Sequence, residues 1–262
     1  MSHIRSKKRV EDLGEVFTDE REVKAMLELV GLSKGGFYKD ITKIRKGVRI
    51  FEPAVGTGNF LIGALRHMHS VIEYANSDAL AHTKKIYISS SLRNYLTDLL
   101  WVVCSLYGVD IMEDNVLSCR NNLLTELDSS IRKFLESRRI FKVKGCLQTY
   151  DKDLREPFLR VARGILLNNI IIGDTINAPH KIHIVEYYPG GSESLPNRKY
   201  IQVKICTLQN MVDFNTGAIQ STKYWYATRK PRLIFSEEGK KVEELLLTLA
   251  DKKEVANGSI EQ

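Results

Sequence analysis

One stretch near the start of the chain, residues 48–60, limits the possible folds more than any other. It opens with the short β-branched and apolar run from Val48 to Phe51, turns at Gly56 and Gly58, and leads into a second apolar run. A strand, a glycine turn and a helix in this order indicate a small-molecule site at the carboxyl end of a parallel strand. Glycine suits such a turn because it adopts positive φ and lets a ligand approach the backbone.

Two kinds of ligand fit a turn of this type, and the flanking residues favour one of them. A dinucleotide-binding turn has a third small residue where helix and strand pack closely, but here that position is Leu61. The strand ends at Glu52, which would repel a pyrophosphate and attract a cationic amino-acid head group. S-adenosylmethionine has such a head, with an α-ammonium near a sulfonium. The stretch therefore favours a nucleoside site of this kind, and the alternative is a turn that is only structural.

At these residues the sequence resembles the amino-methylating DNA methyltransferases, especially the adenine-specific ones. Their first motif is similar to residues 52–60, which read EPAVGTGNF. Further similar segments lie at 14–18, 107–111 and 172–174, in the order that the family has, so the resemblance covers about the first two thirds of the chain. It implies an α/β, Rossmann-like, doubly wound fold that binds S-adenosylmethionine and carries a helical insertion at about 72–104.

The resemblance also implies the residues that would bind this cofactor. Glu52 would bind the methionine ammonium, Asp110 the ribose hydroxyls and Asp174 the adenine amino group, and all three follow predicted strands. Taken alone, an aspartate at the end of a strand caps a helix or turn more often than it binds a ribose. The expected set of cofactor-binding residues is Phe17, Thr18, Glu52, Pro53, Ala54, Gly56, Gly58, Phe60, Asp110, Ile111 and Asp174.

The catalytic motif of the family, Asp or Asn followed by two prolines and an aromatic residue, is missing, because the sequence contains no consecutive prolines. Residues 186–189, which read EYYP, occupy roughly its place, so Glu186 and Tyr187 are the candidate catalytic residues. The implied reaction is methyl transfer to the exocyclic amino group of adenine in DNA, as in restriction–modification or phage systems. The alternative is a degenerate methyltransferase that binds cofactor and nucleic acid or a partner subunit. Methylation of RNA or protein also stays open.

Composition adds weaker expectations about partners and location. A net charge of +7 and a pI near 9.1 have the sign expected of a DNA-binding protein. The four cysteines are widely spaced and the histidines have no metal-ligand spacing, so we expect neither a metal site nor a disulfide framework. No apolar run approaches the ~20 residues of a membrane span, and the amino terminus lacks the apolar stretch of a signal peptide. We therefore expect no membrane contact and a cytoplasmic protein.

The predicted organisation has three parts. Residues 1–47 form an arm and a cofactor-covering helix, 48–252 a methyltransferase-like α/β domain, and 253–262 a flexible tail. Thr18 is the expected N-cap of the first helix, which should end at Gly31. Its apolar stripe is Val23, Met26, Leu27, Leu29 and Val30. Later elements are expected at 59–71 (helix), 80–104 (helix), 106–111 (strand), from 114 (helix), 168–172 (strand) and 181–189 (strand), the last of these continuing the sheet.

Overall fold

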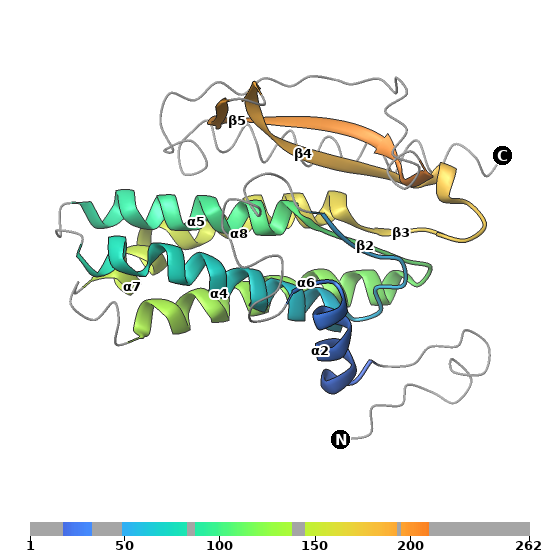
Figure 1. Ribbon diagram of the computed structural model, residues 1–262, viewed down its shortest axis with the longest axis horizontal. Coiled ribbons are helices and arrows are strands. Elements are labelled where there is room, and N and C mark those ends of the chain that lie inside the picture. Colours follow the sequence, from blue (N-terminus) through green and yellow to red (C-terminus); the bar gives the residue numbers. More distant parts are fainter. Residues whose placement is uncertain (1–17, 33–48, 83–86, 138–144, 193–194, 210–262) are drawn as a thin grey trace.

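The computed structural model describes residues 18–32, 49–82, 87–137, 145–192 and 195–209 (Figure 1). Within the predicted first part, 1–47, residues 1–17, including Phe17, lie outside the described residues, and so does the predicted tail at 253–262. In chain order the elements are α2 (Glu20–Leu29), β1 (Ile50–Glu52), α4 (Asn59–Ala81), α5 (Ile88–Cys104), β2 (Leu106–Asp110), α6 (Glu113–Glu136), α7 (Cys146–Thr149), a π-helical turn (Tyr150–Leu154), α8 (Arg155–Asn169), β3 (Ile170–Ile172), a 3-10 turn (Pro179–Lys181), β4 (His183–Ser192) and β5 (Leu195–Thr207).

The centre of the fold is a small, open parallel sheet with the strand order β1-β2-β3. Glu52 pairs with Gly108, and Asp110 pairs with Ile172, so the three strands end close together at one edge. All five residues of β2 are buried, as expected of the middle strand of a parallel sheet. The described chain is therefore a mixed α/β fold, as the strand and helix pattern predicted.

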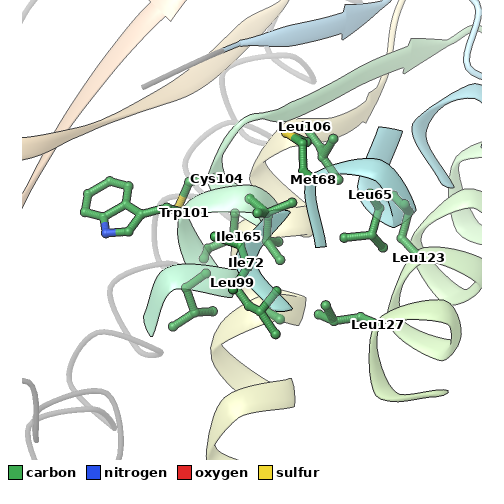
Figure 2. Packing of buried hydrophobic residues seen from close by; sticks show 14 of the residues in the cluster. Leu65, Met68, Ile72, Leu99, Trp101, Cys104, Leu106, Leu123, Leu127 and Ile165 are labelled. Atoms are coloured by element: carbon green, nitrogen blue, oxygen red, sulfur yellow. The ribbon is translucent and has the colours of Figure 1, made fainter. Parts of the chain in front are cut away.

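Helices cover one face of this sheet. Ile50, Leu106 and Ile170 point into the same core as the buried side chains of α4, α5, α6 and α8. Each new strand of this sheet is added at the same edge, in the order β1-β2-β3. Because the crossovers between parallel strands are right-handed, this order places their helices on one face. Figure 2 shows the centre of this core, where Leu65, Met68, Ile72, Leu99, Leu123, Leu127 and Ile165 lie together.

The opposite face of the sheet is covered by the β4–β5 hairpin (Figure 1). Tyr107, Val109 and Ile171 pack there against Ile182 and Ile184 at the start of the hairpin, and Leu208 at its end joins them. β4 pairs with β5 in an antiparallel sheet of its own and does not continue the parallel sheet, which corrects the expectation for residues 181–189. A doubly wound sheet has helices on both faces. Within the described residues, helices cover one face of this sheet and the β4–β5 hairpin covers the other.

Two helices, α4 and α5, connect β1 to β2. α4 has 23 residues and continues to Ala81, ten residues beyond the predicted end. Its second half and α5 occupy the place of the predicted insertion, but they pack into the main core through Ile72, Leu92 and Leu99, which are fully buried. This segment is therefore an integral part of the helical layer and not an appended module. Among the described residues, no helix combines the length and apolar character needed to cross a membrane.

The first described helix, α2, begins one residue later than predicted. Its N-cap is Asp19, not Thr18: the Asp19 carboxylate accepts from Arg21 N at 2.9 Å, and Glu22 Oε2 accepts from Asp19 N at 3.1 Å, which completes a capping box. The predicted stop at Gly31 is confirmed, because Gly31 has a φ of 78° after the last turn.

The apolar stripe of α2 is narrower than the sequence pattern indicated. Only Val23 and Leu27 are buried, whereas Met26, Leu29 and Val30 are exposed. Leu32, just after the helix, is also buried, and its N–H donates to Leu27 O at 2.8 Å. Within the described residues, α2 therefore packs on the core through the short ridge of Val23 and Leu27, with Leu32 beside it.

Candidate functional site

The two glycines of the turn after β1 have different roles. Both adopt positive φ, 51° at Gly56 and 93° at Gly58, which favours glycine at each position. A Cβ at Gly56 would meet nothing within 4 Å, whereas a Cβ at Gly58 would lie 2.7 Å from Cys119 Sγ on α6. Gly56 thus faces open space where a ligand could approach the backbone, and Gly58 allows α4 and α6 to pack closely.

Asp110, at the end of β2, binds the glycine turn directly. Its Oδ2 accepts a hydrogen bond from Gly56 N at 2.8 Å. Its Oδ1 accepts from Met112 N at 2.9 Å and from Asn115 Nδ2 at 3.3 Å, which ties it to the start of α6. An ionised carboxylate has about four acceptor sites, so these three bonds leave roughly one for a ligand hydroxyl. Asp110 therefore holds the site together and retains limited capacity to bind.

Glu52, at the end of β1, is half-buried beside the same turn. Burial raises the pKa of its carboxyl above the usual 4.5, and a hydrogen bond from Ala54 N, at 3.4 Å, partly offsets this rise. A carboxylate that has lost part of its hydration gains more from a cation than an exposed one does. In its ionised form Glu52 could therefore pair with an ammonium group. Pro53 and Ala54, which follow it, are exposed.

Asp174, after β3, organises the neighbouring loop. Its Oδ1 accepts from Ile176 N at 3.0 Å and from Asn177 N at 2.9 Å, and its Oδ2 accepts from Asn177 Nδ2 at 2.7 Å. The hydrogen bond from the backbone N–H of Asn177, followed by the one from its side chain, lowers the pKa of Asp174 below its usual value. As at Asp110, three bonds leave about one acceptor site for a ligand amino group.

The three strand ends converge, as their order in the sheet predicts. Gly173 N donates to Asp110 O at 2.9 Å, and Thr175 Oγ1 donates across β2 to Pro53 O at 3.2 Å. Ile111 and Ile172, which flank Asp110, are 60% and 47% exposed. The edge therefore combines three carboxylates with apolar side chains that are open to solvent, a mixture suited to a ligand with a ring, hydroxyls and a cationic group.

The other expected site residues lie nearby or in the core. Thr18 is half-buried, and its carbonyl accepts from Asn59 Nδ2 at 3.0 Å, which places the start of α2 beside the glycine turn. Phe60 is 8% exposed and belongs to the main core, so its side chain supports the turn from below. Phe17 lies outside the described residues.

The structure places Glu186 and Tyr187 away from this edge. Ile182 at the start of β4 lies against the carboxyl end of β3, since a Cβ at Gly173 would be 2.7 Å from it. β4 then runs toward the opposite end of the sheet, where Glu186 Oε1 pairs with Arg49 Nη1 at 2.6 Å, just before β1 begins. Tyr187 is buried in the core. These two residues are thus not brought together with Glu52, Asp110 and Asp174.

Several residues that position the site were not singled out from the sequence. Asn115 binds Asp110, Asn59 binds Thr18 O, and Asn122 Nδ2 donates to Thr57 O at 3.0 Å. Cys119 supports Gly58, and burial raises the pKa of its thiol to about 12, which makes it a packing residue and not a nucleophile. The only available signal was position: Asn115, Cys119 and Asn122 occur in the first turns of the helix after Asp110.

Neither of two grooves on the described surface is lined by Glu52, Asp110 or Asp174. One, of about 640 Å³, separates α2 from α4, and the other, of about 680 Å³, lies between α6 and α8. In the second, Asp128 accepts from Arg155 and from Tyr150 and also pairs with Arg132, so the charge of Asp128 is compensated within the protein. The described residues contain no group of three or more histidine, cysteine or acidic side chains that could hold a metal ion.

Comparison of the chain with protein-family models, with curated proteins and with solved structures finds no match.

Proposed function

We propose that this chain binds S-adenosylmethionine at the carboxyl ends of β1, β2 and β3. The observation that carries the proposal is the convergence of Glu52, Asp110 and Asp174 at neighbouring strand ends beside Gly56, whose Cβ position is open. Ligands of open α/β sheets bind at this edge. The finer assignment to a doubly wound methyltransferase fold is part of the same proposal.

The residues present fit the chemical groups of this ligand. The half-buried carboxylate of Glu52 suits the α-ammonium, and the remaining acceptor sites of Asp110 and Asp174 suit ribose hydroxyls and the adenine amino group. Ile111 and Ile172 offer apolar contacts to the adenine ring. Gly56 lets the ligand approach the backbone, and Thr18 would meet the carboxylate end.

The proposed reaction is methyl transfer to the exocyclic amino group of adenine in DNA. When bound, S-adenosylmethionine supplies a methyl group on a positively charged sulfur. Transfer would join this methyl group to the amino nitrogen, release the neutral thioether S-adenosylhomocysteine, and pass the proton of the amino group to solvent. The part of this chain is to hold the ammonium at Glu52 and the nucleoside at Asp110 and Asp174, which orients the reacting carbon. We do not assign the acceptor of the target amino group to Glu186, whose carboxylate is paired with Arg49.

A second candidate function is a module that binds cofactor and nucleic acid, or a partner subunit, without transferring the methyl group. The observation that favours it is that Glu186 pairs with Arg49, just before β1, and that Tyr187 is buried, so neither joins the three carboxylates at the strand ends. In this case the chain would still bind S-adenosylmethionine, and a partner would supply the groups that orient the target.

Binding and transfer are tested separately. Titration calorimetry with S-adenosylmethionine tests the site, and we expect wild-type binding that Glu52→Ala weakens. Leu117→Ala, an exposed leucine on α6, is the control that should bind as the wild type does. No affinity in the wild type, or equal affinity in Glu52→Ala, would reject the site.

Transfer is followed with tritiated S-adenosylmethionine and DNA of mixed sequence. Label in the DNA that is lost with Glu52→Ala supports the enzyme, and release of N6-methyladenine on digestion identifies the acceptor atom. Binding without label in DNA supports the second candidate, and label in RNA or protein would redirect the substrate.

A further inference from the structure

The helix α2 is attached to the rest of the described molecule through few contacts. Of its ten residues only Val23 and Leu27 are buried. Both lie on α4 at Gly63, where a Cβ would be 2.8 Å from Val23 Cγ1 and 2.8 Å from Leu27 Cδ1. The close contact between the two helices therefore depends on a position of α4 that has no side chain.

A hydrogen bond makes the second attachment. Asn59 Nδ2 donates to Thr18 O at 3.0 Å, just before α2 begins. Asn59 and Gly63 are four residues apart on α4, so they lie on the same face of that helix. Asn59 is also the first residue after the glycine turn. One face of α4 thus carries two contacts: the hydrogen bond from Asn59 to Thr18, and the apolar contact of Gly63 with α2.

The remaining space between the helices is a groove of about 640 Å³, lined among others by Asp19, Lys24, Ile62 and Arg66. α2 and α4 therefore touch along a ridge and are otherwise separated. An element with few buried apolar contacts opens locally at a low free-energy cost. The buried side chains that hold α2 are Val23, Leu27 and, just after the helix, Leu32, and the cost of ordering the segment offsets part of the free energy that their burial supplies.

We infer that α2 docks reversibly on this seat, formed by Gly63 and Asn59, and that its docking sets the affinity of the ligand site at the glycine turn. The inference rests on the proposed function, in which Thr18 contacts the carboxylate end of S-adenosylmethionine. Because the ligand gains this contact only when α2 is docked, its apparent affinity falls in proportion to the docked fraction. Gly63 and Asn59 are positioning residues that act through Thr18.

Gly63→Val tests the seat, since two methyl groups would occupy the space of Val23 and Leu27. Ala75→Val is the matched control, because it places the same β-branched residue at an exposed position of α4. Asn59→Ala removes only the hydrogen bond to Thr18. Titration calorimetry measures the Kd of S-adenosylmethionine, and hydrogen exchange read by mass spectrometry measures protection of residues 20–29 and, separately, of α4.

We expect Gly63→Val to raise the Kd about 10-fold or more and to remove exchange protection from α2 while α4 stays protected. Asn59→Ala should raise the Kd about 5-fold, and Ala75→Val should change neither quantity. Loss of protection in α2 with an unchanged Kd would overturn the link to the site. Full protection of α2 in Gly63→Val, or equal effects in Ala75→Val, would overturn the role of the seat.

Failure of the proposed function gives a different result. If the wild type has no affinity for S-adenosylmethionine, the proposed function is rejected, and the link between docking and affinity is rejected with it. The exchange comparison between Gly63→Val and Ala75→Val still decides whether Gly63 holds α2 in place.

Discussion

Replacing Gly58 by alanine should lower the free energy of unfolding by about 2–5 kcal/mol, and two separate costs make up this figure. The first is the backbone: at a φ of 93° an L-residue is strained by about 1–2 kcal/mol. The second is overlap, since the new Cβ would lie 2.7 Å from the sulfur of Cys119, a residue with no exposed surface. Overpacking of this kind costs about 1–3 kcal/mol.

The two costs can be separated with matched variants. Gly56→Ala introduces a Cβ at another positive φ but meets nothing within 4 Å, so it should show only the backbone cost. Cys119→Ala removes the sulfur and leaves Cys119 Cβ, at 3.4 Å, as the nearest atom. The double variant Gly58→Ala with Cys119→Ala should therefore be more stable than the sum of the single effects by about 1–3 kcal/mol.

Urea unfolding followed by circular dichroism measures all four variants. Equal losses for Gly56→Ala and Gly58→Ala would show that the overlap has no energetic weight. Strict additivity in the double variant would show the same. Either result would refute the assignment of Gly58 to close packing against Cys119.

Three further predictions concern pH and the core. Burial lowers the pKa of His69 to about 4, so as the pH drops the unfolded state takes up a proton before the folded state does. The free energy of unfolding should therefore fall by up to about 3 kcal/mol between pH 6.5 and 4. Urea titrations at several pH values should show this slope between pH 6.5 and about 5 in the wild type and not in His69→Gln, and parallel curves for the two proteins would contradict it. Because the pKa of Glu52 is raised, its carboxyl takes up a proton at pH values that are still above 4.5, and the protonated carboxyl no longer attracts an ammonium. The affinity for S-adenosylmethionine should therefore begin to fall before the pH has dropped to 4.5. Calorimetry should find weaker binding that does not depend on pH in Glu52→Gln. Leu99→Ala should lower the free energy of unfolding by about 2–5 kcal/mol because Leu99 is fully buried. Leu117→Ala, at a residue that is 49% exposed, should lower it by less than about 0.5 kcal/mol. Thermal unfolding measures both variants, and similar losses would argue against the described core.

Features with a local cause were predictable from the sequence. The β2 strand, the helix after Gly58 and the stop at Gly31 depend on apolar runs and on glycine, whose effects act within a few residues. The neighbouring positions of Glu52 and Asp110 followed as well, since consecutive strands of a parallel sheet usually lie side by side.

Features decided by distant contacts were not predictable. α4 continues to Ala81 because its second half packs on α5, where Asn76 Nδ2 binds the buried Asp98 at 3.2 Å. The alternation of apolar residues in β4 fits a parallel strand or a hairpin equally well, and the antiparallel partner β5 settled the outcome. Asp19 was a missed local signal, because Glu22 stands at the position that completes its capping box.

The shortness of the parallel strands has a consequence for how the chain acquires its site. β1 and β3 have three residues each, and Gly56 is 54 residues from the aspartate that binds it. Contacts between such distant positions form slowly, because the intervening chain must lose its freedom before any bond rewards it. The helical core is no more local, since Arg66 on α4 pairs with Glu126 on α6 across 60 residues. We therefore expect the core and the carboxylate edge to form in one cooperative step. A truncated chain that ends before β3 would lack both Asp174 and the strand that pairs with Asp110.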